Sequence, residues 1–162
     1  LIPCTAKGVI DLLDFYDISL EGKDVLIINR SNIVGKPLAQ LFLRRNATVT
    51  IAHSKTEQLK EKVKQADIVV TGVGIPNFLR YDDFKPGTVV IDVSINFVDG
   101  RMVGDVKKSS YGYLQTLGGL TPVPGGVGQC TVIALMENVI QIAETEDCPT
   151  LMRFQNMNIE EE

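Results

Sequence analysis

The clearest structural signal in the chain is the stretch Val25-Leu26-Ile27-Ile28-Asn29-Arg30-Ser31-Asn32-Ile33-Val34-Gly35. Its first four residues form a continuous apolar run rich in β-branched side chains, which is typical of a strand covered on both faces in a parallel sheet. A polar loop follows, and Leu38, Leu41 and Phe42 then recur at helical spacing. A strand, a polar loop and a helix in this order predict one unit of an α/β fold.

The same alternation continues along the chain in both directions. Further strands are predicted at 48–52, 68–71 and 89–93, with a charged helix at 56–65. Upstream, Thr5 is expected to cap a helix that ends near Asp17. The four strands between Val25 and Val93 are predicted to be parallel neighbours, because helical segments separate their apolar runs.

Repeated strand, helix and strand units predict a doubly wound α/β fold. Its sheet is expected to be mostly parallel and Rossmann-like, with helices on both faces. We assign residues 1–145 to this single domain and 146–162 to a C-terminal tail. The chain begins with Leu1 and not with methionine, which suggests a fragment of a longer protein. Binding residues are expected in the loops beyond the carboxyl ends of the strands.

In the last third of the chain a helix and a turn can be predicted, but one segment has no predicted structure. The final helix carries an apolar stripe, for which core packing is the expected reason. The stripe consists of Val132, Leu135, Met136, Val139, Ile140 and Ala143. Asp99-Gly100 predicts a tight turn between two short extended pieces, whereas no structure is predicted for 107–119.

The composition excludes several functional classes. Sixteen basic and 20 acidic residues give a net charge of −4, which lacks the positive field that phosphate-backbone binding requires. The apolar runs are far shorter than the roughly 20 residues needed to span a bilayer. Three widely spaced cysteines predict neither a disulfide framework nor a metal motif, and they favour a reduced cytoplasmic environment. We therefore expect a soluble protein without a nucleic-acid, membrane or metal partner.

The loop after the first strand is a candidate cradle for a dinucleotide. In Rossmann folds the pyrophosphate lies at the N-terminus of the following helix. The usual G-x-G-x-x-G pattern is absent, and Asn29 stands where the first glycine would be. Because asparagine tolerates a positive φ, the loop is expected to keep its turn. An ordinary strand-to-helix loop without a ligand is the alternative interpretation.

The end of the second strand favours a cofactor that carries a 2′-phosphate. NAD-binding folds place an acidic residue there for the ribose hydroxyl, but His53-Ser54-Lys55-Thr56 contains none. Hydroxyls and a cation, together with Arg30, suit a phosphate. Helix capping is the alternative for Ser54 and more so for Thr56, and a structural role is the alternative for His53.

Two glycine-rich segments follow later strands. Gly72-Val73-Gly74-Ile75-Pro76 lies where close approach of a cofactor requires small residues, although a plain turn has the same composition. The segment 121–128 precedes the last helix, and its amides can meet a ligand there. Tyr81 and Lys85 match the Tyr-x-x-x-Lys pair of short-chain dehydrogenases, but Pro86 interrupts the helix that this pair needs. A surface loop is the preferred interpretation of that pair.

These segments together resemble the C-terminal half of the bifunctional methylenetetrahydrofolate dehydrogenase/methenyltetrahydrofolate cyclohydrolase family. The resemblance runs from Pro3 to about Ala143 and is most specific in Thr121-Pro122-Val123-Pro124-Gly125-Gly126-Val127-Gly128. It also includes Arg30-Ser31, the run 33–37 and His53-Ser54-Lys55-Thr56.

The resemblance implies oxidation of 5,10-methylenetetrahydrofolate by hydride transfer to NADP, then hydrolysis to 10-formyltetrahydrofolate, in cytoplasmic one-carbon metabolism that feeds purine biosynthesis. A homodimer is expected. The cofactor-binding residues expected are Asn29, Arg30, Ser31, Val34, Gly35, His53, Ser54, Lys55, Gly74 and Ile95. The substrate-binding residues expected are Pro124, Gly125, Gly126, Val127, Gly128, Gln129, Cys130, Thr131 and Val132. The family's catalytic lysine and tyrosine, and an aspartate that binds the pterin, are expected in a domain upstream of Leu1, so this chain alone is expected to be inactive.

The chain departs from the family pattern at positions near the expected sites. Ala6 replaces a proline, Asn29 and Ser94 each replace a glycine, and Gln129-Cys130 replaces Pro-Met. Asn29 and Ser94 are expected to affect how closely the cofactor approaches, and Gln129-Cys130 the folate side. Two alternatives therefore stay open: a monofunctional NAD(P)-dependent dehydrogenase of this family, and a non-catalytic nucleotide-binding module.

Overall fold

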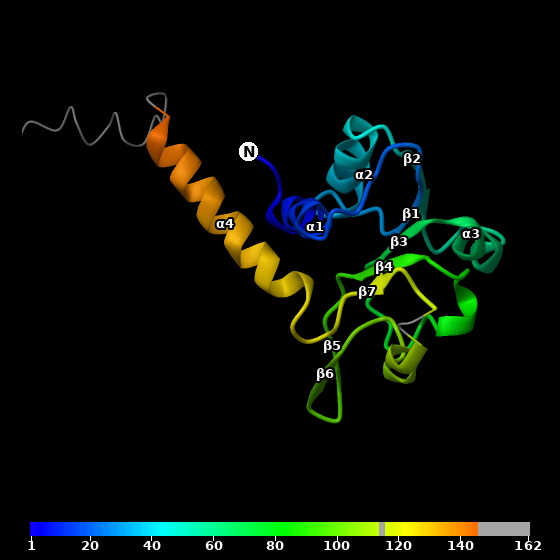
Figure 1. Ribbon diagram of the computed structural model, residues 1–162. Helices are drawn as coiled ribbons and strands as arrows, with labels where there is room; N and C mark the ends of the chain where they lie inside the picture. Colours follow the sequence, from blue (N-terminus) through cyan, green and yellow to red (C-terminus); the bar gives the residue numbers. More distant parts are fainter. Residues whose placement is uncertain (114–115, 146–162) are drawn as a thin grey trace, which may run out of the picture.

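A five-stranded parallel sheet forms the centre of the molecule in the computed structural model, which describes residues 1–113 and 116–145 (Figure 1). The strand order is β2-β1-β3-β4-β7. The bounds are β1 Asp24–Ile28, β2 Thr48–Ala52, β3 Ile68–Thr71, β4 Val89–Asp92 and β7 Gly119–Leu120. Each neighbouring pair is parallel, which confirms the prediction of four adjacent parallel strands between Val25 and Val93.

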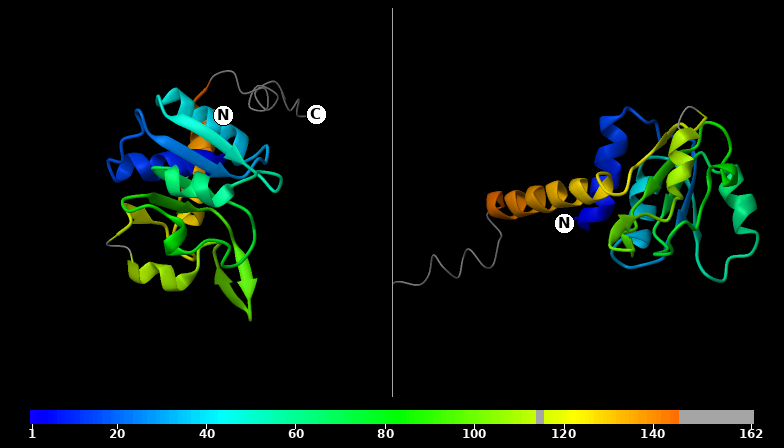
Figure 2. Two further views of the ribbon diagram at one scale, coloured as in Figure 1. Left: turned by 90° about the vertical axis from the view of Figure 1, so that its right-hand side faces the viewer. Right: turned by 90° about the horizontal axis from the view of Figure 1, so that it is seen from below.

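Helices cover both faces of this sheet, as the alternation of strands and helices predicts (Figure 2). Their bounds are α1 Cys4–Phe15, α2 Gly35–Arg44, α3 Leu59–Gln65 and α4 Val127–Glu144. On one face Ile27 shares a buried cluster with Leu13 of α1 and Phe42 of α2. On the other face Leu26 packs in a cluster with Val63 of α3. Since successive strand residues point to opposite faces, a central strand needs an apolar residue at every position.

Two helices begin differently from the predictions. α1 begins at Cys4 with Pro3 at the N-cap and no side-chain cap, so Thr5 lies inside the helix. The Thr5 hydroxyl instead lies 3.4 Å from the hydroxyl of Thr131 in α4. α3 begins only at Leu59, after Gln58 adopts a left-handed φ of 53°. In both helices the first residue is set without a side-chain cap, so a capping residue in the sequence did not mark the start.

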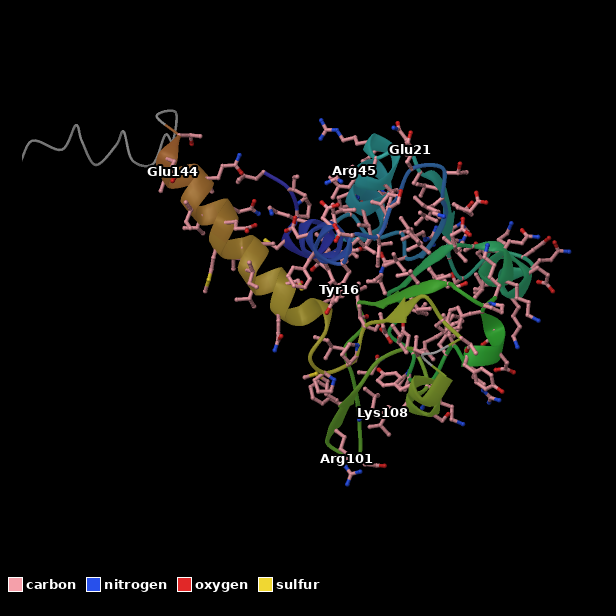
Figure 3. All side chains as sticks on the ribbon, in the orientation of Figure 1. Tyr16, Glu21, Arg45, Arg101, Lys108 and Glu144 are labelled. Carbon is pink, nitrogen blue, oxygen red and sulfur yellow. The ribbon has the colours of Figure 1, made fainter. Side chains whose placement is uncertain are left out.

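The apolar stripe of α4 is exposed, so the prediction that core packing explains it is wrong. Only Val127, Ala134 and Asn138 of α4 are buried. The stripe faces away from the body, and Figure 3 shows the side chains of α4 standing clear as far as Glu144. The exposed large side chains are Val132, Ile133, Leu135, Met136, Val139 and Ile140, all more than half exposed. Helical periodicity identifies an apolar face, but it cannot say whether this chain covers it.

The Asp99-Gly100 turn is confirmed, and the segment without a prediction contains two short elements. β5 (Asn96–Val98) and β6 (Arg101–Val103) form an antiparallel hairpin. Asp99 and Gly100 have φ values of 49° and 72°, and Arg101 follows the turn (Figure 3). Downstream lie a 3₁₀ helix, η2 (Lys108–Tyr113), and β7. The predicted tail, 146–162, lies outside the described residues. In the described ranges no helix has the length and apolar character required to cross a membrane.

Candidate functional site

A cavity of about 530 Å³ lies beyond the carboxyl ends of β1, β2 and β3, where the strand order reverses. It brings together five of the expected cofactor residues: Asn29, Arg30, Ser31, His53 and Ser54. Val34, Gly35, Lys55, Gly74 and Ile95 do not line it. The lining also includes Thr56, Leu59 and Phe78, which provide a partly apolar wall. Ligands of doubly wound sheets bind at such reversal points.

Asn29 keeps the first loop in shape through its side chain, and the expected positive φ does not occur. The Asn29 Oδ1 atom accepts hydrogen bonds from the amides of Ser31 (2.8 Å) and Gly35 (3.2 Å). Its Nδ2 atom donates to the carbonyl of Gly72 at 2.7 Å, which joins the loops after β1 and β3. A Cβ added at Gly35 would collide with the backbone of Asn29, so this position requires glycine, and a Cβ at Gly72 would press on the side chains of Val93 and Asn29.

The amides at the start of α2 already have acceptors within the chain. Val34 donates to the Ser31 hydroxyl at 3.1 Å, Gly35 donates to Asn29, and Lys36 donates to the Ser31 carbonyl at 3.0 Å. A phosphate at this end of α2 would therefore meet amides that already donate hydrogen bonds to acceptors within the chain. A bound anion has to be held mainly by side chains, of which Arg30 is an exposed cation beside the loop.

The segment after β2 is a closed turn, and neither Ser54 nor Thr56 caps α3. The Thr56 hydroxyl accepts from the amide of His53 at 2.8 Å, and the Thr56 amide donates to the His53 carbonyl at 2.8 Å. The helix-capping alternative for Ser54 and Thr56 is wrong, because α3 begins at Leu59 without a side-chain cap. The amide of Lys55 donates to His53 Nδ1 at 3.1 Å. Ser54 and Lys55 remain exposed.

A second cavity of about 240 Å³ joins the end of β4 to the loop before α4. It places the expected cofactor residue Ile95 beside six of the expected substrate residues. Those six are Pro124, Gly125, Gly126, Val127, Gly128 and Thr131. Gln129 and Cys130 instead line a larger cavity of about 660 Å³ between α1 and β7. Val132 lies further along α4 and is 52% exposed.

Asp92 is a buried carboxylate at the edge of this second cavity, and the sequence analysis did not single it out. Its Oδ1 atom accepts from the amide of Ser94 (3.0 Å) and its Oδ2 atom from the amide of Val106 (2.8 Å). Burial, helped by the nearby charge of Asp105 and opposed by the amide hydrogen bonds, raises the pKa of Asp92 from 3.8 to about 6. A Cβ at Gly104 would collide with the Asp92 carboxylate.

Tyr111 is a second residue that the sequence analysis missed, because it lies in the stretch without a predicted structure. Its hydroxyl accepts from the amide of Val123 at 3.2 Å, next to the cis bond between Val123 and Pro124. Burial raises the pKa of the Tyr111 hydroxyl above its ordinary value. Tyr111 therefore supports the loop that carries the expected substrate residues. Among the described residues no group of His, Cys, Asp and Glu side chains could hold a metal ion.

Comparison with known proteins gives a consistent picture. The family described as "Tetrahydrofolate dehydrogenase/cyclohydrolase, NAD(P)-binding domain" matches residues 3–147. The bifunctional protein FolD of Lactobacillus helveticus is 51% identical over 151 residues, which cover 90% of this chain and 51% of that protein.

Two solved structures extend the comparison. The FolD structure from Campylobacter jejuni has a TM-score of 0.83 at 44% identity, covering 87% of this chain and 50% of the other. The Trypanosoma brucei enzyme, solved with NADP cofactor and an inhibitor, has a TM-score of 0.79 at 38% identity, covering 86% and 50% of the two chains. The chain spans about half the length of the relatives it matches.

Proposed function

This chain belongs to the tetrahydrofolate dehydrogenase/cyclohydrolase family, and from that premise we propose that it is the cofactor-binding half of a bifunctional enzyme. The enzyme oxidises 5,10-methylenetetrahydrofolate and hydrolyses the methenyl product to 10-formyltetrahydrofolate. When bound, NADP supplies the acceptor for the hydride that leaves the methylene carbon. The observation that carries the proposal is the cavity at the reversal of strand order, which gathers Asn29, Arg30, Ser31 and Ser54.

NADP is the proposed cofactor because the lining of this cavity suits a 2′-phosphate. Arg30 and Ser54 line it, and exposed Lys55 follows Ser54 in the same turn. The lining contains no carboxylate to repel a phosphate or to bind the ribose hydroxyl of NAD. A guanidinium and a hydroxyl can give charge-assisted hydrogen bonds to a dianionic phosphate.

The second cavity is the proposed meeting place of the two substrates. Ile95 would lie by the nicotinamide ribose, and the loop 124–128 would form one side of the folate cleft. Because both line one small cavity, cofactor and folate can approach each other there. Gln129 and Cys130, on the first turn of α4, would adjust the folate side from the neighbouring cavity.

The acid and base groups of the cyclohydrolase step are proposed to lie in a preceding domain. The relatives are about twice as long as this chain, which leaves room for such a domain. The exposed stripe of α4 is the proposed contact surface, since more than half of each of its large apolar side chains is open. The segment Leu1–Ile2 contacts the same helix, because Asn138 of α4 donates to the carbonyl of Ile2 at 2.8 Å. On the family resemblance we also propose a cytoplasmic homodimer.

Calorimetry and turnover together test this function. Titration of the chain with NADP and NAD at one ionic strength should give tighter binding of NADP, because only NADP reaches Arg30 and Ser54 with a phosphate. Equal or stronger binding of NAD would contradict the 2′-phosphate site. The full-length polypeptide should show both activities, whereas this chain alone should show neither. A full-length protein that oxidises methylenetetrahydrofolate but does not hydrolyse the methenyl form would be the monofunctional alternative.

A further inference from the structure

Asp105 is a fully buried carboxylate that accepts six hydrogen bonds. Three come from the consecutive amides of Val73 (2.7 Å), Gly74 (3.1 Å) and Ile75 (3.0 Å), in the loop after β3. The other three come from side chains, namely Thr71 Oγ1 (2.8 Å), Ser94 Oγ (2.8 Å) and Asn96 Nδ2 (3.2 Å). Consecutive amides that converge on one point form an anion-binding concavity, and here a side chain of the same protein occupies it.

Four of the six donors lie in the loops after β3 and β4, which border the nicotinamide end of the proposed cleft, and Thr71 and Asn96 are the strand residues at the edges of these loops. One loop contains Gly74, an expected cofactor residue. The other contains Ile95, whose neighbours on both sides, Ser94 and Asn96, bind Asp105 through their side chains. Ile95 itself is 58% exposed and lines the second cavity. The carboxylate of Asp105 therefore fixes the backbone on either side of Ile95 and leaves its side chain free to face a ligand.

Ser94 adds a direct bridge between these two loops. Its hydroxyl donates to Asp105 Oδ2 and accepts from the amide of Gly74 at 3.2 Å. The side chain is buried, with 7% of its surface exposed. A glycine at this position, which is the residue typical of the family pattern, cannot make either contact. The bridge is thus a property of this sequence, and it sets the distance between the Gly74 loop and the Ile95 loop.

We propose that Ser94 and Asp105 are positioning residues that set where the loops of Gly74 and Ile95 meet the nicotinamide half of the cofactor. This inference rests on the proposed function. Ser94 lines the second cavity, but its hydroxyl is engaged with Asp105 and the amide of Gly74, and Asp105 is fully buried. Both residues therefore act through the backbone of the two loops. Hydride transfer depends steeply on the placement of the nicotinamide, whereas hydrolysis of the methenyl group needs no hydride acceptor. Disturbing the bridge should therefore affect the dehydrogenase more than the cyclohydrolase.

The substitution Ser94→Ala isolates this effect, because it leaves none of its partners without a hydrogen bond. The amide of Gly74 still donates to Asp105 Oδ1, and Asp105 Oδ2 still accepts from Thr71 and Val73. The variant is therefore expected to fold. Asp105→Asn is the more severe variant, since an amide nitrogen would face buried N–H donors, and it is expected to lose thermal stability.

The experiment measures both activities of the full-length protein with NADP and with the matching folate substrates. For Ser94→Ala, the ratio of dehydrogenase kcat to cyclohydrolase kcat should fall about three- to tenfold, because the hydroxyl bridge between the two loops is lost. Asn96→Ala should lower the same ratio, because it frees the other neighbour of Ile95. Ser19→Ala, at an exposed serine between α1 and β1, is the matched control and should leave the ratio unchanged.

The outcomes separate this inference from the function on which it rests. A fall in both activities by the same factor would mean that Ser94 only stabilises the fold, and the inference would be overturned. An unchanged ratio in both Ser94→Ala and Asn96→Ala would also overturn it, while the proposed function would stand. Absence of dehydrogenase activity in the unsubstituted full-length protein would overturn the proposed function and, with it, this inference.

Discussion

The side chain of Asn29 donates from Nδ2 to the carbonyl of Gly72 at 2.7 Å, and this hydrogen bond joins the loop after β1 to the loop after β3. The same carboxamide accepts from two amides of its own loop, so all three contacts depend on one residue. Asn29 therefore holds together the two loops that border the proposed cofactor cavity. It does so at a position where glycine is usual in dinucleotide-binding loops.

Asn29→Ala should lower the free energy of unfolding by about 2 kcal/mol, because it leaves partly buried backbone groups without partners. Urea denaturation of this chain measures the change. Asn32→Ala is the matched control, since Asn32 is in the same loop but contacts only the exposed Lys36 side chain. Its cost should stay below about 0.5 kcal/mol. Equal costs for the two variants would show that the Asn29 contacts do not hold the loop.

Arg30→Ala should weaken NADP binding about ten- to a hundredfold, because one or two charge-assisted hydrogen bonds to the 2′-phosphate are lost. NAD binding should change much less. Arg44→Ala, at an exposed arginine near the end of α2, controls for the general loss of a positive charge. Calorimetry at fixed ionic strength measures the affinities of the parent and both variants for NADP and for NAD. If Arg30→Ala weakens both cofactors equally, Arg30 supports their shared part or the loop itself.

The raised pKa of Asp92 predicts that stability falls as the pH rises from about 4 to above 6. In this range the folded state keeps the proton of Asp92, with a pKa of about 6, while the unfolded state, with a pKa of 3.8, has released it. The protonated folded form is therefore favoured at low pH, and about 3 kcal/mol of stability is lost above pH 6. Subtracting the stability curve of Asp92→Asn from that of the parent isolates this contribution. A difference that stays flat between pH 4 and pH 7 would contradict it.

Met136→Ala should change the stability of this chain by less than about 0.5 kcal/mol, because the Met136 side chain is 60% exposed. Leu13→Ala, in the fully buried contact region of α1, should cost about 2–5 kcal/mol. In the full-length polypeptide Met136→Ala should cost clearly more than in this chain, since a preceding domain would cover the stripe. The same small cost in both proteins would mean that the α4 stripe is not the contact surface.

The strands of the sheet could be predicted well from the sequence, because each strand is marked by the residues that it contains. Strands β1, β3 and β4 each contain a run of three or four consecutive apolar residues, and the two covered faces of the sheet favour such runs. The tight turn at Asp99-Gly100 could also be predicted from the sequence, because few residue pairs adopt two successive positive φ values. The exposure of the α4 stripe could not be predicted from the sequence, since the burial of an apolar helix face depends on which other element packs against it.

The candidate site was predicted in part. Arg30, Ser31 and Ser54 could be placed in one cavity because they follow neighbouring parallel strands. The role of Asn29 was misjudged, because backbone tolerance suggested a positive φ while the side chain makes the decisive contacts. Asp105 could not be found in advance, since its partners include Thr71, 34 positions earlier, and nothing local distinguishes a carboxylate that binds amides from one in solvent.

The β5–β6 hairpin also bears on the order in which the site can assemble during folding. Asn96 and Ser94 lie only 9 and 11 positions before Asp105, and Asp92 lies 14 positions before Val106, so the hairpin brings them together by closing a small loop. Short loops close with little entropy loss and on a fast timescale. The contacts of Asp105 with the loop after β3 span 30 positions or more, and they have to wait for β3 and β4 to pair. A mutation that slows closure of the turn at Asp99-Gly100 would therefore delay the hydrogen bonds between Asp105 and the amides of the loop after β3. The strands of the sheet would by then already be paired in register.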